Sequence, residues 1–372
     1  MFLASSLWGN IAFLALAAIF QLKKISIDDF RTNLFKIILI IIVLSLVNYV
    51  FSLVINGGTF INNSNAAYPY AFSMIFAYIL AATITEKNLK WLLFFILIDA
   101  MVGVAEYTCG VKSFWNVTND TFEESSELLY FRRSAGINNS SSILGLKIVI
   151  GLCIIYILRP KYKIIYLSIL LAGLFCSFNR TYILASFPLW IYFGYERYKQ
   201  LGFKAKLVVI CGVSICGMYI LISIMPVIEE QFFRGNSSLS GGALSHRDEI
   251  WHQFMSFYKS HPISGNGSVK MLLPNGWHAH NSFIWVLASN GIVIASLYYL
   301  YLIAFLNKKI LVPMVSLILG SITQCSIYWG LSLCDIFVFY LILNRHRTNL
   351  CANSESLSRG RCIRTINGTL KF

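Results

Sequence analysis

Apolar runs of about 20 residues, the length that crosses a bilayer as one helix, recur along this whole chain. The chain has 372 residues, of which 57% are hydrophobic and 12% are charged. That is about half the charge of an ordinary soluble domain and too little to cover one or two soluble domains of this size. The pattern predicts an all-α polytopic membrane protein. It excludes a soluble enzyme with one anchor, a disordered chain and a disulfide scaffold.

The apolar runs predict about eleven transmembrane helices. The first run lacks a basic start and many more runs follow it, which favours a membrane helix over a cleaved signal peptide. The expected helices lie at about 2–22, 35–55, 68–86, 90–108, 141–158, 163–178, 181–196, 206–225, 282–306, 310–326 and 329–344.

The basic residues set the orientation of these helices. The net charge is +14, which in a soluble protein would suggest nucleic-acid binding. Twenty-one of the 30 Lys and Arg residues fall after odd-numbered helices or in the tail, and eight fall on the opposite side. The positive-inside rule makes the first side cytoplasmic, so no nucleic-acid partner is expected. The resulting parts are helices one to eight at 1–225, a large external loop at 226–281, helices nine to eleven at 282–344 and a basic cytoplasmic tail at 345–372.

The large external loop carries most of the polar chemistry. It begins with a Gly/Ser-rich segment at 236–242 and continues at 243–260 with apolar residues at helical spacing, which predicts a helix at the membrane surface. His261-Pro262 ends that helix and Gly265-Asn-Gly267 forms a turn. A second external loop, between about 109 and 140, holds an acidic stretch at 123–127.

Several catalytic motifs are missing from the sequence. It has no Gly-x4-Gly-Lys-Ser/Thr phosphate loop, no Asp-x-Asp metal clamp and no His-Glu-x-x-His. None of the nine cysteines forms Cys-x-x-Cys, so they resemble small hydrophobic residues rather than zinc ligands. An ATP-driven pump and a cytoplasm-facing nucleotide-sugar transferase are disfavoured.

Three external residues are candidates for chemistry. Arg180 lies in a very short break between two apolar helices, where a guanidinium could bind phosphate or merely snorkel to the headgroups. Arg247 begins the presumed surface helix, where it could pair with a neighbouring acid. His280 stands at the external mouth of helix nine and could orient or deprotonate a hydroxyl, or be structural. His278 could complete a metal pair, but no Cys or carboxylate lies close in sequence, and we expect no metal.

Four further charges lie inside predicted helices, where they are costly. Asp335, in the outer half of the last helix, could pair with an external arginine. Lys147 is about two turns into helix five and could snorkel outward. The other two are Asp99 and Glu106.

In this arrangement the sequence resembles the bacterial O-antigen ligase and O-antigen polymerase superfamily. Its Arg-x3-Leu motif corresponds to Arg180-Thr-Tyr-Ile-Leu184, and its His-Asn-x9-Gly-x-x motif corresponds to His280-Asn281 followed by 291–294. Ile294 departs from the small or polar residue usual at the final position. Residues 245–267 resemble the arginine-bearing loop with its His-Pro and glycine turn. Arg133-Ser-Ala-Gly-Ile-Asn138 resembles the Arg-x-x-Gly entry to a helix.

The resemblance implies a GT-C-like fold and a metal-independent, cofactor-free, inverting glycosyl transfer at the periplasmic face of the bacterial inner membrane. The donor would be an oligosaccharide on undecaprenyl diphosphate, with its isoprenoid tail among the helices, and membrane lipids would be further partners. Arg180 and Arg247 would bind the diphosphate, and His280 would act on the acceptor hydroxyl. Asn281, Asp335, Arg133 and His278 would support them.

The residues do not determine which glycan lipid is the acceptor. A polymerase transfers the chain to another lipid-linked repeat unit, and a ligase transfers it to lipid A-core in lipopolysaccharide biosynthesis. The short chain and Ile294 favour a polymerase, for which a chain-length regulator protein is a conceivable partner, whereas the Gly-Leu-Ser-x-x-Asp335 run is ligase-like. A transporter of lipid-linked oligosaccharide is a third, more distant reading, because the polar residues concentrate in one external loop rather than in paired broken helices.

Overall fold

The computed structural model describes most of the chain, and its secondary structure there is helical. The only β-type pairing among these residues is an isolated bridge between Pro69 and Val269. The predicted acidic stretch at 123–127, the Gly/Ser segment at 236–242 and the basic tail lie outside them. The described residues are 7–25, 30–55, 69–110, 133–138, 140–219, 247–274, 276–328 and 331–344.

Each predicted apolar run contains a helix in the described part of the chain. The external loop adds α11 (Arg247–Ser260), which ends before His261-Pro262 as the sequence predicts. The other elements are α1 (Leu7–Gln21), η1 (Leu22–Lys24), α3 (Asn33–Ile55), η2 (Tyr70–Phe72), α4 (Ser73–Thr83), α5 (Glu86–Cys109), α6 (Ser141–Leu158), α7 (Lys163–Cys176), α8 (Arg180–Lys199), α9 (Phe203–Tyr219), α12 (Ser282–Ala304), α13 (Leu311–Ile322) and a last helix at Leu333–Asn344.

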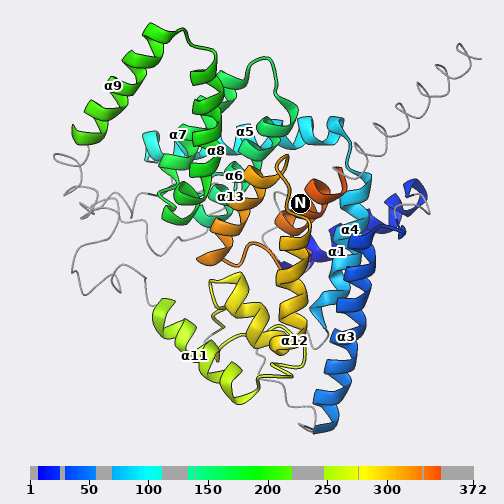
Figure 1. Cartoon of the computed structure of the whole chain (residues 1–372). Helices are drawn as coiled ribbons and strands as arrows, with labels where there is room; N and C mark the ends of the chain where they lie inside the picture. The colour runs from blue at the N-terminus through cyan, green and yellow to red at the C-terminus, as the bar shows by residue number, and fades with distance from the viewer. Residues whose placement is uncertain are drawn as a thin grey trace, which may run out of the picture.

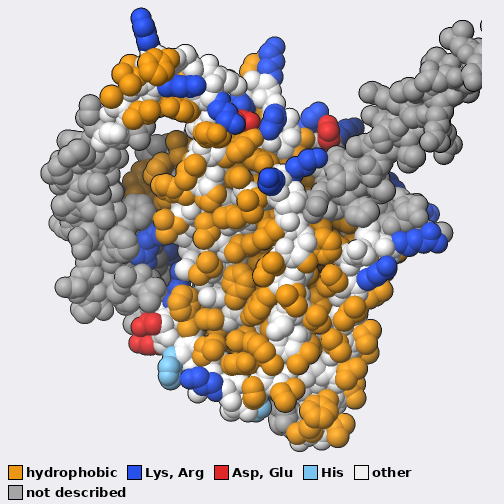
Figure 2. Space-filling model, viewed as in Figure 1, with side chains coloured by type: hydrophobic (Ala, Val, Ile, Leu, Met, Phe, Trp, Pro, Cys, Tyr) orange, Lys and Arg blue, Asp and Glu red, His pale blue; other side chains and the backbone are white. Residues whose placement is uncertain are grey.

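Length and composition make four of the described helices, α3, α5, α6 and α12, capable of crossing a membrane. Helices α7, α13, the last helix and the η2–α4 segment are apolar but shorter. Figure 2 shows a broad hydrophobic surface with Lys and Arg gathered along its upper edge. A water-soluble protein rarely exposes so large an apolar surface. These are the features of a membrane-embedded helical protein.

The helices form two connected groups (Figure 1). In one group α5 packs against α6 and α7, and α8 packs against α6 and α13. In the other group α12 packs against α3 and α11. Close approach within the first group depends on small residues, because the position of a Cβ on Gly173 lies only 2.8 Å from the Cβ of Ala100.

The predicted continuous helix at 282–306 is wrong in one respect, because α12 breaks at Gly291. Gly291 has φ 73°, which side chains disfavour, and a Cβ there would overlap the Ile263 carbonyl. The turn predicted at Gly265-Asn-Gly267 fills the break. Its Asn266 amide donates to the Ala288 carbonyl over 2.9 Å, and the Ile292 amide donates to Pro262 over 2.9 Å. The His-Pro turn and the broken helix therefore form one unit.

The predicted helix at 310–326 is also too long. Helix α13 ends at Ile322, and 323–328 form a non-helical connection to the last helix. The connection leaves the helical path because its polar groups bond to other helices. The Thr323 hydroxyl lies 2.7 Å from that of Thr181, and the Ser326 hydroxyl lies 2.7 Å from that of Tyr182. These two bonds hold the 323–328 connection against the start of α8.

Candidate functional site

His280 and Asn281 form the entry to α12. The Asn281 carboxamide oxygen accepts the amide hydrogens of Phe283 (2.9 Å) and Ile284 (3.0 Å), so it is the N-cap of the helix. His280 precedes the cap with φ 48°, a left-handed conformation uncommon for a residue with a side chain. The predicted supporting role of Asn281 is thus a positioning one: it fixes where α12 begins and where His280 stands.

The two histidines of the loop lie side by side and are held neutral. The ring centroids of His278 and His280 are 4.0 Å apart, and both residues are half-buried. Burial, followed by the charges of His280 and Arg247, lowers the pKa of His278 to about 4. Burial and then Arg247 also lower the pKa of His280 below its usual 6.5, while a hydrogen bond with Gln324 opposes the shift. At neutral pH His280 is therefore uncharged and able to accept a proton.

Helix α11 carries Arg247 to these histidines. Trp251, one turn after Arg247 and on the same helix face, donates its indole N–H to the Ala279 carbonyl over 2.7 Å. Ile250 and Phe254 are buried, which anchors α11. The Arg247 charge acts on His278, His280 and Tyr182, so it is within electrostatic reach of both the α12 entry and the start of α8.

The start of α8 connects to the same place through polar side chains. Asn179 caps α8, accepting the Tyr182 amide hydrogen over 3.2 Å, and Arg180 is the first helical residue, half-buried. The Asn179 amide group donates to the Ser142 hydroxyl over 2.9 Å. Gln324 donates to the same hydroxyl over 3.3 Å, and its carboxamide oxygen lies 3.5 Å from His280 Nδ1.

Gln324 lies beside Nδ1 of His280. With its amide group facing Ser142, its oxygen faces His280 and can only accept a hydrogen. This arrangement favours the His280 tautomer with the hydrogen on Nδ1 and the lone pair on Nε2. The sequence does not single out Gln324, because this residue falls inside the predicted helix at 310–326. A polar Thr-Gln-Cys-Ser run at the external end of an apolar segment was the available signal.

Lys270 and Cys325 were also missed by the sequence analysis. Lys270 is half-buried, and burial lowers its pKa to about 8, against the opposing charge of Asp335. The Cys325 thiol lies against the backbone amides of His280 and Asn281, and burial raises its pKa to about 12. Lys270 adds a further cation to this end of the bundle, while Cys325 stays a neutral thiol.

Asp335 has a local role in the described structure. Its carboxylate accepts the Tyr328 amide hydrogen over 2.7 Å and the Ser332 hydroxyl over 2.8 Å. The Ser332 oxygen accepts the Asp335 amide hydrogen in turn, which is the geometry of a helix cap. Asp335 thereby closes the 323–328 connection and starts the last helix.

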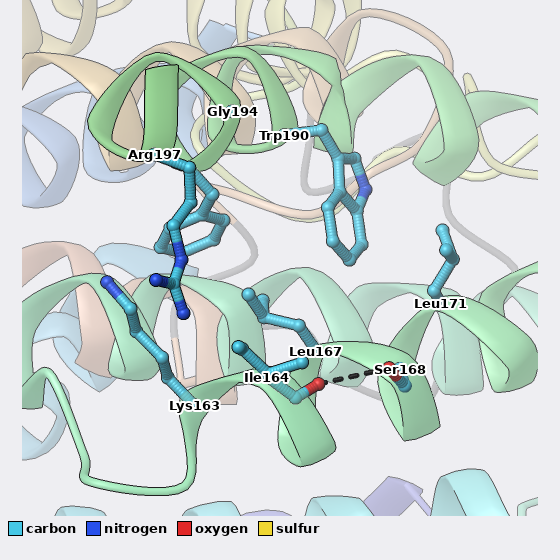
Figure 3. Close-up of a pocket in the computed structure, with 9 residues that line it drawn as sticks. Lys163, Ile164, Leu167, Ser168, Leu171, Trp190, Gly194 and Arg197 are labelled. Atoms are coloured by element: carbon cyan, nitrogen blue, oxygen red, sulfur yellow. Dashed lines mark hydrogen bonds between the residues drawn. The ribbon is translucent and has the colours of Figure 1, made fainter. Parts of the chain in front are cut away.

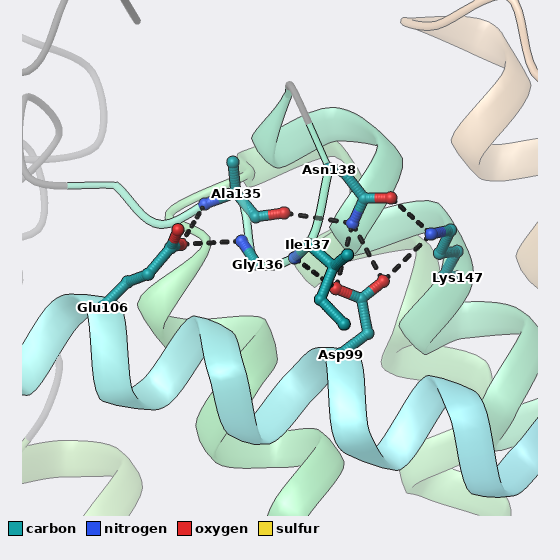
Figure 4. A network of polar contacts seen from close by, with 7 residues as sticks. All are labelled: Asp99, Glu106, Ala135, Gly136, Ile137, Asn138 and Lys147. Atoms are coloured by element: carbon teal, nitrogen blue, oxygen red, sulfur yellow. Dashed lines mark hydrogen bonds and ion pairs between the residues drawn. The ribbon is translucent and has the colours of Figure 1, made fainter. Parts of the chain in front are cut away.

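Arg133 belongs to a segment that two buried carboxylates of α5 hold in place (Figure 4). Glu106 accepts the amide hydrogens of Ala135 (3.0 Å) and Gly136 (2.7 Å). Asp99 accepts the amide hydrogen of Ile137 over 2.8 Å. In the same segment, the Ser134 amide donates to Cys176 at the end of α7. The Arg-x-x-Gly segment is thus fixed beside the turn that leads to Arg180.

Lys147 completes this buried network and does not snorkel outward as the sequence analysis allowed. Its ammonium lies 3.0 Å from the Asp99 carboxylate and also bonds to the Asn138 carboxamide oxygen. Asp99 and Lys147 are both buried, with 0% and 6% of their surfaces exposed. A buried pair of this kind is costly to break, because removing one partner leaves the other charge without its counterion.

Replacing Lys147 by methionine is expected to lower the free energy of unfolding by about 3–5 kcal/mol. The Asp99→Asn/Lys147→Met double variant should recover most of that loss, since it removes the remaining charge. Thermal unfolding in detergent measures both, with Lys87→Met, an exposed lysine at the start of α5, as the control. A Lys147→Met protein as stable as the wild type would contradict the stabilising role of the buried Asp99–Lys147 pair.

The described structure brings the predicted residues to one end of the bundle. A series of polar contacts from Asn179 through Ser142 and Gln324 connects the Arg180 end of α8 to His280. Helix α11 adds Arg247 to the same end. No group of three or more His, Cys, Asp or Glu side chains that could hold a metal occurs among the described residues. No family model, curated protein or solved structure matches the chain.

Proposed function

We propose that the protein is a glycosyltransferase that moves an undecaprenyl-diphosphate-linked glycan onto an acceptor hydroxyl at the periplasmic face of the inner membrane. The most favoured acceptor is another lipid-linked repeat unit, which makes it an O-antigen or polysaccharide repeat-unit polymerase. The full proposal includes about eleven membrane crossings in a GT-C-like arrangement. The observation that carries it is the convergence of a neutral histidine and Arg247, both from the external loop, with Arg180 at the start of α8.

The anion-binding character of this end of the bundle supports a diphosphate substrate. Helices α6, α8 and α12 begin there at Ser141, Arg180 and Ser282, so their positive dipole ends face the same region. Arg180, Arg247 and Lys270 add positive side chains. Helix N-termini and guanidinium groups are the usual partners of phosphate in proteins.

The proposed reaction needs one base and one cation cluster. His280 Nε2 takes the proton of the acceptor hydroxyl as its oxygen bonds to the anomeric carbon of the donor sugar. The bond from that carbon to the diphosphate oxygen breaks, and its electron pair stays on the diphosphate. Arg180 and Arg247 stabilise the charge that builds there. The configuration inverts because the attack is in line with the leaving group.

Gene deletion followed by gel analysis of the lipopolysaccharide separates the alternatives. A polymerase leaves core carrying one repeat unit, whereas a ligase leaves bare core with polymer still on undecaprenyl diphosphate. Loss of a transporter would leave the lipid-linked units on the cytoplasmic side. An unchanged ladder, in cells with no second copy of the gene, would contradict all three.

The pH dependence of transfer tests the coupling between Arg247 and His280. Activity requires neutral His280, so it is lost as the pH falls through the lowered pKa of this histidine. Arg247→Gln removes one cause of the lowering, so the acid limb should move to higher pH. Transfer rates measured from pH 5 to 8 show the shift. Lys259→Gln, at the exposed far end of α11, should leave the limb in place, and an unmoved limb in Arg247→Gln would refute the coupling.

A further inference from the structure

Helices α7 and α8 line a groove of about 300 Å³ (Figure 3). It reaches Arg197 near the end of α8, whereas Arg180 of the candidate site begins that helix. Its wall is apolar along Ile164, Leu167 and Leu171 of α7 and Trp190 of α8. Lys163 and Arg197 lie together at one end of the groove, and Trp190 and Leu171 lie toward the other. The groove is therefore amphipathic, with a cationic mouth and an apolar interior.

The mouth carries net positive charge. The Lys163 ammonium lies 3.3 Å from a Glu196 carboxylate oxygen, and Arg159 lies 3.5 Å from the other. One carboxylate thus faces two cations. Arg197 is exposed and makes no ion pair within the described residues, so its planar guanidinium is available to a ligand.

The dimensions of the groove match one leaflet of a bilayer. From Lys163 to Leu171 it follows nine residues of α7, or about 12 Å along the helix axis. Half of the hydrocarbon core of a bilayer is about 15 Å. The orientation expected from the basic residues puts the mouth at the cytoplasmic surface, where anionic lipids gather and where basic pockets between helices bind their headgroups.

Gly194 keeps the groove open on the α8 side. A Cβ built on Gly194 would meet nothing within 4 Å, so a side chain there would extend into free space. The Trp190 indole is fixed on the same wall, because its N–H donates to the Ser186 hydroxyl over 3.1 Å. An extended hydrocarbon chain can therefore lie against the α8 backbone and the indole ring.

We propose that this groove binds an anionic phospholipid of the cytoplasmic leaflet. The phosphate lies between Lys163 and Arg197, and one acyl chain lies along Leu167 and Trp190. The assignment rests on the proposed membrane orientation but not on glycosyl transfer, so the two can fail separately.

Native mass spectrometry of the full-length protein in detergent tests the site with dioleoyl phosphatidylglycerol and dioleoyl phosphatidylcholine as probes. The wild type should bind the anionic lipid on the order of tenfold more tightly, because the choline ammonium cancels the phosphate charge of phosphatidylcholine and is repelled by the cationic mouth. Arg197→Gln should reduce the affinity for phosphatidylglycerol toward that for phosphatidylcholine. Gly194→Leu fills the groove and should weaken both lipids. Lys199→Gln, on the same helix end but outside the groove, should change neither.

Three results would overturn the proposal. They are equal binding of the two lipids by the wild type, unchanged binding in both groove variants, and a loss in Lys199→Gln as large as that in Arg197→Gln. A fourth contradicting result would be inorganic phosphate that binds as tightly as the phospholipid, which would indicate a headgroup site without an acyl chain. Circular dichroism and melting temperatures check folding, and Gly194→Ala replaces Gly194→Leu if the latter does not fold.

Discussion

Replacing His280 by glutamine is expected to slow glycan transfer by two to four orders of magnitude, the usual contribution of a positioned general base. Glutamine keeps a polar side chain of similar reach but cannot take a proton at neutral pH. Donor binding should change little, because the diphosphate is assigned to Arg180 and Arg247. The loss should therefore appear in kcat rather than in KM, measured with lipid-linked oligosaccharide extracted from the host.

His252→Gln is the matched control for this variant. His252 is exposed on α11, in the same external loop, and the same substitution there should leave the rate unchanged. A His280→Gln protein that folds and transfers glycan at the wild-type rate would remove the base from the mechanism. Equal losses in the two variants would point to a general disturbance of the loop instead.

Replacing Gly291 by alanine is expected to lower the free energy of unfolding by about 2–6 kcal/mol. A side chain at φ 73° and ψ 177°, a conformation used almost only by glycine, costs about 1–3 kcal/mol, and forcing atoms into a filled space adds about 1–3 kcal/mol. The new methyl would overlap the Ile263 carbonyl, so the His-Pro turn must move away from α12. Asn48, whose amide group donates to the Ser264 carbonyl over 2.8 Å, would lose its place on that turn.

Gly212→Ala provides the comparison in thermal unfolding measurements. Gly212 lies within helix α9, and a Cβ there meets nothing within 4 Å, so alanine should be neutral or slightly stabilising. Transfer activity should fall in Gly291→Ala as well, since the turn and α12 together hold the His280 entry. Equal melting temperatures for the two variants would contradict the role of Gly291.

Sequence periodicity predicted the approximate positions of the α-helices in the described residues, because hydrophobic runs and their polar interruptions are local properties of the chain. It also predicted the α11 helix and its end, since proline limits the residue before it. It could not place the break at Gly291. That break depends on a turn some 25 residues earlier that receives the freed backbone groups, and such a contact is tertiary.

The candidate site was predictable in its arginines and in His280-Asn281, and not in Gln324, Lys270 or Cys325. Arg180, Arg247 and His280 stand out because ionisable residues are rare on the external side of this chain. Gln324 does not stand out, because its importance comes from lying between Ser142 and His280 in the fold. Lys147 was misread for a similar reason, since its partner Asp99 lies 48 residues away, on α5.

Glycan transfer by the purified protein is the most direct measurement of the central claim. The full chain is reconstituted in liposomes with undecaprenyl-diphosphate-linked oligosaccharide from the host, without nucleotide and with a metal chelator. If the protein is a repeat-unit polymerase, we expect lipid-linked products that are longer by whole repeat units. These products should be absent with the His280→Gln and Arg180→Gln variants. Products formed equally by the wild type and His280→Gln, or formed only when ATP is added, would contradict it.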